Sequence, residues 1–349
     1  MSQIALIGLP NVGKSTVFSS LTKQESQIGV FSFSTSEMVT GFGEVKDNRL
    51  KEAAVIENSA KIVYPKLQVY DIPLNPNKPL FTPNLFGKLR EMDGFVLVLR
   101  DFYGNGIDWG EVPRSINEQI EKINVELIIA DLEILSTKEE KLLKESKALA
   151  EKPRELKIVE KAINLLGEGS QLKDHKWESE EVSFFKDLSP LTLKPRVLLV
   201  NTEEQNINYE QPINNTSEWV VTSAKIEHEI SLLPDLEQNE LRKEYQMDKS
   251  LLDNLLSSIY KELNLISFFT IGDKESKAWT VLKGSKITEA AGKIHSDLQK
   301  GFIKAEIVSI VDFIDNQGWN GLKNSTKLRL EGKDYLVTDG DVVIIRFSK

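Results

Sequence analysis

The sequence predicts an α/β core with an inserted helical hairpin and a C-terminal β-rich domain. Three observations support this architecture. Near the N-terminus, a glycine-rich loop lies between an apolar strand and a helix. Further on, 95 residues separate two buried strands, whereas a single crossover takes about 30. From about residue 265, the pattern changes to short strands around one helix.

The glycine-rich loop carries the strongest motif in the chain. Residues 3–7 (QIALI) are predicted as a strand, and GLPNVGKST leads into VFSSLTK, whose apolar spacing is helical. Gly8, Gly13, Lys14 and Ser15 fill the pattern GxxxxGKS. Such glycines aim backbone N–H groups inward, the lysine reaches the β- and γ-phosphates, and the serine hydroxyl serves Mg²⁺. A chance match on a strand-to-helix turn is the alternative, but this context favours a P-loop whose nucleotide contacts are Asn11, Val12, Gly13, Lys14, Ser15 and Thr16.

A P-loop needs a carboxylate at the end of a neighbouring strand to hold Mg²⁺ through water. Asp71, which ends KLQVYD, meets this requirement; by itself it could equally be a turn-forming Asp before a proline-rich loop. A threonine after the first helix usually completes the metal shell, and Thr35 is the first candidate, with Thr40 as the second. The predicted metal ligands are therefore Ser15, Thr35 and Asp71.

Base recognition is predicted after two later strands. The strand RVLLVN ends at Asn201, and Glu204 follows where guanine-specific proteins place the Asp of NKxD. That Asp accepts from two N–H donors of guanine, which adenine lacks, so the longer Glu favours ATP over GTP. Ser223 and Ala224, with the aliphatic stem of Lys225, lie at the end of another strand, where they can pack around a base.

The long insertion is predicted to be a helical hairpin. Apolar residues recur at alternating steps of four and three, as in a coiled coil. Pro153 then marks a break before a second amphipathic helix. The two seams consist of Ile116, Ile120, Ile123, Leu127, Ala130 and Ile134, then Leu156, Val159, Ile163 and Leu166. Periodicity alone leaves open whether these helices pack on the core or form a projecting arm that meets a partner.

The last 85 residues are predicted to form a β-grasp domain, in which one helix lies among several antiparallel strands. The strands are KAWTV, FIKAEIVS and DYLVTDGDVVIIRF, where Asp339-Gly340 is a hairpin turn signal, and KITEAAGKIHSDL is a compact helix. Seven lysines between residues 274 and 304 could contact an RNA backbone, although a solvated face is the commoner explanation. A lone His295 on the small helix is expected to be structural rather than catalytic.

Composition excludes several classes of protein. The chain has 349 residues and no Cys, and its three His residues are scattered, so neither a disulfide framework nor a zinc site is expected. No apolar run approaches the ~20 residues that span a bilayer, and no signal peptide precedes the first strand, so we expect a cytoplasmic protein without a membrane partner. The net charge of −9 argues against nonspecific nucleic-acid coating, but residues 265–349 carry net +2.

Taken together, these motifs resemble the YchF/Obg-like ATPases, a branch of the P-loop GTPase superfamily. The resemblance covers nearly the whole chain and includes GLPNVGKST, FSFSTSE, INVELIIADLEIL, LNLISFFTIG and AAGKIHSDLQKGFIKAEI. It implies a Mg²⁺-dependent nucleotide-binding core that prefers ATP, an inserted helical hairpin and a C-terminal TGS domain of β-grasp fold. It also implies binding to the ribosome or its RNA, without DNA-specific binding, and a role in translation or stress. We expect a monomer.

The expected boundaries are 1–115 for the first part of the core, 116–190 for the helical arm, 191–264 for the second part of the core and 265–349 for the TGS domain. The sequence predicts nucleotide binding and leaves hydrolysis open. The family it resembles keeps DxxG and is thought to use a His after the next strand. Here DIPL puts Pro73 and Leu74 where the Gly is expected, and Asp108 or Trp109 lies near the His position. The catalytic residues are therefore unknown, and two hypotheses follow: a slow ATPase, or a nucleotide-binding adaptor that does not hydrolyse.

Overall fold

The computed structural model describes residues 2–22, 38–72, 80–103, 110, 112–146, 153–206, 217–245, 247, 250–323 and 325–348. The chain divides into two compact units. Unit 1 comprises residues 1–42 and 68–258, and unit 2 comprises residues 43–67 and 259–349. Residues 43–67, which sequence analysis left within 1–115, therefore belong with the C-terminal part.

Unit 1 is built on a six-stranded sheet in the order β2-β4-β1-β5-β6-β7. β1 pairs parallel with β4 and β5, and β6 pairs parallel with β5 and β7. The strands are β1 (Gln3–Ile7), β2 (Val39–Glu44), β4 (Lys66–Asp71), β5 (Gly94–Asp101), β6 (Arg196–Thr202) and β7 (Trp219–Thr222). β5 and β6 are buried along almost their whole length, as continuous apolar runs in a covered parallel sheet should be.

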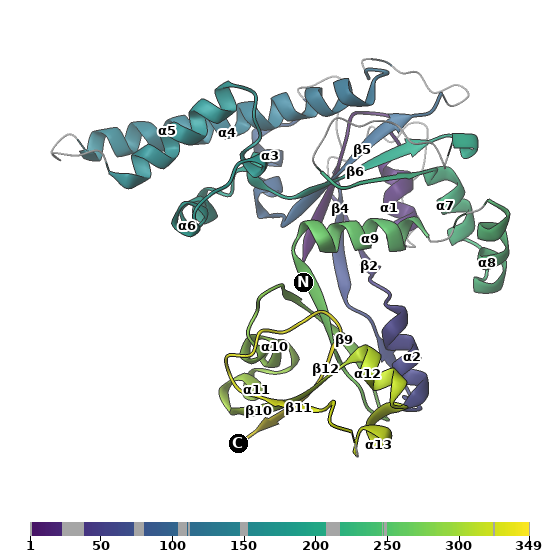
Figure 1. Cartoon of the computed structure of the whole chain (residues 1–349). Helices are drawn as coiled ribbons and strands as arrows, with labels where there is room; N and C mark the ends of the chain where they lie inside the picture. Colours follow the sequence, from purple (N-terminus) through teal and green to yellow (C-terminus); the bar gives the residue numbers. More distant parts are fainter. Residues whose placement is uncertain are drawn as a thin grey trace. The chain divides into compact units, whose positions relative to one another are not determined.

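The helices of unit 1 lie around this sheet and in the insertion between β5 and β6 (Figure 1). They are α1 (Lys14–Thr22), α3 (Pro83–Glu91), α4 (Ile116–Ser146), α5 (Arg154–Gly167), α6 (Ser179–Leu188), α7 (Ala224–Ser231) and α8 (Asp235–Glu244). α9 (Leu251–Glu262) leads out of the unit. Short 3-10 turns occupy Leu172–Asp174, Leu191–Leu193 and Glu204–Asn206.

The insertion forms a helical hairpin with a hydrophobic core of its own. α4 and α5 run side by side and extend away from the sheet (Figure 1). The buried residues of α5 pack against α4 and against Leu172 and Phe185 of the segment that follows. The predicted helical hairpin is thus present, and its packing favours the arm over two helices that simply lie on the sheet.

A buried carboxylate fastens the arm to the sheet. Asp131 in α4 is fully buried and accepts hydrogen bonds from the backbone N–H groups of Leu191 and Thr192, at 2.9 and 2.7 Å, just before β6. Arg90 of α3 also donates to Asp131 at 3.2 Å. Burial raises the pKa of Asp131 despite these donors, so part of their electrostatic gain is offset by lost hydration.

Unit 2 contains a second six-stranded sheet in the order β11-β10-β12-β8-β9-β3. Its strands are β3 (Ile62–Val63), β8 (Leu265–Thr270), β9 (Ser276–Leu282), β10 (Phe302–Ser309), β11 (Arg329–Glu331) and β12 (Asp341–Phe347). Its helices are α2 (Asn48–Ile56), α10 (Ile287–Ile294), α11 (Ser296–Lys300), α12 (Ile310–Asp315) and α13 (Gly318–Leu322). One cluster packs α10 against the sheet, and another packs α2 and α12 against it.

Three sequence expectations for this domain need correction. Asp339 and Gly340 do form a turn, with Gly340 at φ 87°, but the residues before it form only an isolated bridge, so no β-hairpin is made. β12 pairs parallel with β8, so the strands are not all antiparallel. The single predicted helix is broken at His295, whose side chain caps α11 by accepting from the Asp297 N–H. That contact agrees with a structural role for this His.

Candidate nucleotide-binding site

The predicted site residues meet at one edge of the unit 1 sheet. The P-loop follows β1, Asp71 ends β4, Asn201 lies near the end of β6, and Ser223 follows β7. Because neighbouring members of β4-β1-β5-β6-β7 are parallel, their carboxyl ends lie at the same edge. Open α/β sheets bind their ligands at that edge.

The P-loop backbone adopts conformations that most residues avoid. Asn11 has φ 60°, and Gly13 has φ 92°. A Cβ on Gly13 would lie 2.3 Å from Nδ2 of Asn201, so any side chain there would displace the loop from β6. The N–H of Val17 bonds to the carbonyl of Gly13 at 3.0 Å, so the first turn of α1 follows the loop directly. Helix N-termini favour anions. Val12 is buried, and Thr16 is half-buried at the first turn.

Ser15 and Asp71 meet beside this loop. The Ser15 hydroxyl donates to Oδ2 of Asp71 at 2.8 Å. Oδ1 of Asp71 is buried and has no hydrogen-bond partner among the residues that the structure describes. A buried carboxylate oxygen without a donor is costly, and it suits a hard cation with oxygen ligands. Ser15 and Asp71 therefore fit Mg²⁺, which when bound would neutralise phosphate charge.

Lys14 precedes Ser15 in the P-loop, and the pKa of its side-chain amine is shifted. Burial lowers the pKa of Lys14, and attraction to Asp71 raises it only in part. The charged ammonium is thus poorly compensated by the protein alone. A phosphate group next to it would favour the charged form and shift the pKa back upward. A buried lysine of this kind is suited to binding an anion such as a phosphate group.

Asn201 holds two loops together with its side-chain amide. Nδ2 donates to the Val12 carbonyl at 3.0 Å, and Oδ1 accepts from the Ala224 N–H at 2.9 Å. Asn201 is only 6% exposed to solvent. The amide therefore fixes the P-loop against the loop after β7. Its predicted contact with a nucleotide stays a prediction, because both polar groups already bond to protein.

Glu204 and Lys225 face each other across the predicted base-recognition loops. Lys225 Nζ donates to Oε1 of Glu204 at 2.7 Å, and this contact raises the pKa of Lys225. Both side chains are partly exposed, at 70% for Lys225 and 40% for Glu204. Ser223 is buried at the start of α7. Sequence analysis expected the Lys225 stem near a base and did not anticipate that its ammonium binds Glu204.

A second network near this edge was not expected from the sequence. Arg100, fully buried at the end of β5, donates to the carbonyls of Phe102 and Tyr103, both at 3.1 Å. Gln119 in α4 accepts from the Arg100 N–H and donates to its carbonyl, both at 2.8 Å. Glu203 accepts from the Tyr103 N–H at 2.8 Å. Gln119 lies next to the predicted seam of α4, just before Ile120, and this was the one available signal.

Some predicted positions fall outside the described residues. They are Thr35, Pro73, Leu74, Asp108 and Trp109. Thr40, the second metal candidate, lies in β2 with an exposed side chain. Of the three predicted metal ligands, the structure therefore describes only Ser15 and Asp71.

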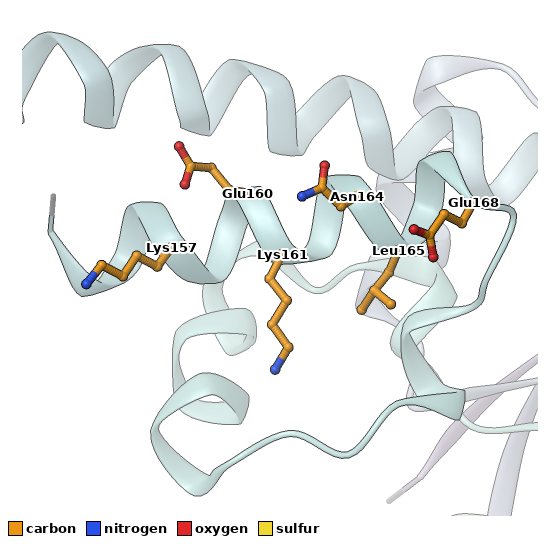
Figure 2. A pocket seen from close by; sticks show the side chains of 6 residues that line it. All are labelled: Lys157, Glu160, Lys161, Asn164, Leu165 and Glu168. Atoms are coloured by element: carbon orange, nitrogen blue, oxygen red, sulfur yellow. The ribbon is translucent and has the colours of Figure 1, made fainter.

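The arm carries a shallow pocket of about 380 Å³ on the exposed side of α5, shown in Figure 2. Lys161 from this pocket pairs with Glu181 at 3.0 Å and lies 4.4 Å from the centre of the Trp177 ring. Its lining mixes two lysines with two glutamates and so favours neither anions nor cations: Lys157, Glu160, Lys161, Asn164, Leu165 and Glu168. Across the described parts of the chain, no helix is long and apolar enough to cross a membrane.

The fold and the site together define a P-loop nucleoside-triphosphatase core with an inserted helical arm and a C-terminal β-grasp unit. Residues 3–161 match the family model described as "50S ribosome-binding GTPase", and residues 265–348 match the YchF-GTPase C-terminal model, described as "Protein of unknown function (DUF933)". The chain belongs to the YchF family, as its relatives show.

Those relatives match along nearly the full chain. The protein named ribosome-binding ATPase YchF is 35% identical in Haemophilus ducreyi, 33% in Bacillus subtilis and 34% in Escherichia coli O157:H7, each over 98% of both chains. The solved structure of the Schizosaccharomyces pombe YchF GTPase matches with a TM-score of 0.86 at 26% identity, covering 99% of this chain and 97% of that one. The predicted family and fold class are confirmed.

Proposed function

We propose that this protein binds a purine nucleoside triphosphate with Mg²⁺, prefers ATP to GTP and hydrolyses it slowly in association with the ribosome. The observation that carries the proposal is the pairing of Ser15 with Asp71, 2.8 Å apart, beside Lys14. These three residues come from the P-loop and β4 and supply a cation, a hydroxyl and a carboxylate with one buried oxygen lacking a described partner. This is the set that a Mg²⁺–triphosphate requires.

The preference for ATP is supported by the ion pair that Glu204 forms with Lys225. A guanine-reading carboxylate must accept from two N–H donors of the base, whereas Glu204 already accepts from Lys225. Its side chain is also one methylene longer than the Asp of NKxD, which moves the carboxylate relative to the base. Reading guanine would require this ion pair to be rearranged, and reading adenine would not.

Ribosome association is supported by the relatives that are named ribosome-binding ATPase YchF. Their sequences align over 98% of this chain. We extend the proposal to a cytoplasmic regulator of translation or the stress response. The helical arm and unit 2 are the parts proposed to meet the ribosome or its RNA. Unit 2 presents several exposed lysines, among them Lys283, Lys300 and Lys304.

A non-hydrolysing adaptor is the second candidate, and the sequence after Asp71 favours it. The motif DIPL offers no Gly N–H at the position that senses the γ-phosphate, and a Pro has no N–H to donate. The only His residues of the chain are His175, His228 and His295, and none precedes residue 175. Binding is expected under both candidates, so hydrolysis separates them.

Side-by-side titrations of ATP and GTP with Mg²⁺ test binding, with Lys14→Ala as the matched variant. We expect ATP to bind more tightly than GTP and Lys14→Ala to abolish both. Equal or tighter GTP binding would refute the role given to Glu204. Phosphate release with and without ribosomes then tests hydrolysis, and release that stays at the Lys14→Ala level in both conditions would leave only the adaptor.

A further inference from the structure

The segment that connects β2 to β4 belongs to a different unit from the sheet that contains these two strands. Both strands belong to the sheet that carries the nucleotide site, yet residues 43–67, which join them, belong to unit 2. The chain therefore leaves the core sheet, becomes part of the C-terminal unit and returns at Gln68, three residues before Asp71. At about 3.3 Å per residue, Gln68 and Asp71 are about 10 Å apart along one continuous strand.

The helix in this connection is a core element of unit 2. Leu50 and Ala53 of α2 are fully buried in the same cluster as Phe269, Phe313 and Val342. α2 also packs against α12 (Figure 1). Because deleting even a few buried methyl groups costs several kcal/mol in well-packed cores, α2 cannot leave this cluster cheaply.

Polar contacts fix both ends of α2 to unit 2. Arg49 donates to Asp339 at 2.8 Å, and Glu57 accepts from the Trp319 N–H at 2.7 Å. Gly318, at φ 83°, passes so close that a Cβ there would lie 2.2 Å from Oε1 of Glu57. Each contact joins residues more than 250 positions apart in sequence.

Beyond α2, the connection becomes an edge strand of the unit 2 sheet. β3 pairs parallel with β9, matching Ile62 to Ser276. The Ser276 N–H donates to the Lys61 carbonyl at 2.8 Å. The hydroxyls of Ser59 and Ser276 lie 2.7 Å apart. Residues 47–63 thus move with unit 2, because separating them would expose apolar surface and break these bonds together.

We propose that residues 43–67 are a mechanical relay, which couples the nucleotide state at Ser15 and Asp71 to the conformation of unit 2. This inference rests on the proposed nucleotide binding. A change in β4 on binding or loss of the γ-phosphate is carried by the strand into α2 and β3, and from there into β9 and α12. Because coupling between sites is reciprocal, a partner that binds unit 2 and alters this conformation changes nucleotide affinity by the same factor.

Hydrogen–deuterium exchange of the full chain tests the relay, with Mg²⁺-ADP compared against Mg²⁺ and a non-hydrolysable ATP analogue. We expect exchange in residues 276–282 and 310–322, which contact the connection, to differ by about fivefold or more between the two nucleotides. Residues 296–300 (α11) are the internal control, because α11 packs mainly against α10, β10 and β12 and is not among the elements in contact with the connection. They should not change.

Matched variants test whether the coupling runs through residues 43–67. Glu57→Ala removes the acceptor for the Trp319 N–H and should reduce the difference, whereas Glu57→Gln keeps a carbonyl acceptor and should preserve it. The chain has no Cys, so Ser59→Cys with Ser276→Cys gives one controllable disulfide. Oxidising that pair in the Glu57→Ala background should restore the difference, and reducing it should remove it again.

The outcomes separate the two proposals. If the P-loop peptide is protected by nucleotide while residues 276–282 exchange equally with ADP and the ATP analogue, the relay is wrong and nucleotide binding stands. If α11 changes as much as β9, the effect is a general stabilisation of unit 2, and the relay is again refuted. If neither nucleotide protects the P-loop peptide, the proposed function fails and the relay fails with it.

Discussion

Replacing Asn201 by Ala removes the side chain that joins the P-loop to the loop after β7. Two buried groups lose their partners, the Val12 carbonyl and the Ala224 N–H, which now bond at 3.0 and 2.9 Å. Leaving a buried polar group unpaired costs about 1–3 kcal/mol. Some water can enter the space left by the amide, so we expect a total loss of about 2–4 kcal/mol in the free energy of unfolding of unit 1.

Nucleotide affinity should fall for a related reason. Asn201 holds Val12 next to the phosphate-binding N–H groups, and a looser loop must be ordered when the ligand binds. We expect Mg²⁺-ATP to bind at least about tenfold more weakly, which corresponds to about 1.4 kcal/mol. Urea unfolding gives the first quantity, and titration with a fluorescent ATP analogue gives the second.

Asn206 provides the matched control, because the same Asn→Ala change there affects an exposed side chain in the turn after β6. Asn206→Ala should stay within about 0.5 kcal/mol of the parent protein. If Asn201→Ala unfolds at the same urea concentration as the parent and binds ATP as tightly, the amide does not hold the loops, and the reasoning fails.

Three further predictions concern stability. Leu50→Ala should cost about 2–5 kcal/mol in unit 2 by urea unfolding, whereas Val55→Ala on the same helix, where the side chain is 68% exposed, should be near neutral; equal effects would show that α2 is not a core element. Arg242→Met removes the two hydrogen bonds that Arg242 donates to the buried Glu227 carboxylate, both at 3.1 Å, and should cost about 3 kcal/mol; a loss below about 1 kcal/mol would contradict this. The pKa of Asp312 is lowered by its hydrogen bond from Ser309. The stability that ionised Asp312 contributes is therefore present above pH 3.8, the ordinary pKa of the group, and is lost as the pH falls through its lower pKa in the folded state. Between about pH 5 and about pH 2 the urea unfolding midpoint should drop more for the parent than for Asp312→Asn, and parallel curves would refute this.

Local pattern was enough for the parts of the site that lie within one strand–loop–helix. Gly13, Lys14 and Ser15 follow an apolar strand and begin α1, so their spacing alone indicates a phosphate loop. Asp71 and Asn201 end apolar runs and were placed correctly at strand ends. The hairpin also follows from local periodicity, but α5 packs against Ile128, Leu135 and Leu142 of α4 and not against the predicted seam residues from Ile116 to Ala130.

Contacts between distant residues were not predictable in the same way. That Glu204 is engaged by Lys225, and that Gln119 bonds to both backbone groups of Arg100, depends on which loops the sheet order brings together. The sequence contains these side chains but says nothing of their pairing, because hydrogen-bond energy depends on distances that only the folded chain fixes.

The class of this protein can be predicted from its amino acids, since a P-loop is a short continuous stretch whose chemistry depends on neighbouring residues. That residues 43–67 belong to the C-terminal unit is apparent only in the folded chain. Nothing in the amphipathic pattern of α2 names the surface it covers, because an apolar face is satisfied by any complementary apolar face. Its place was fixed by burial of Leu50 against Phe269 and by the bond from the Trp319 N–H to Glu57.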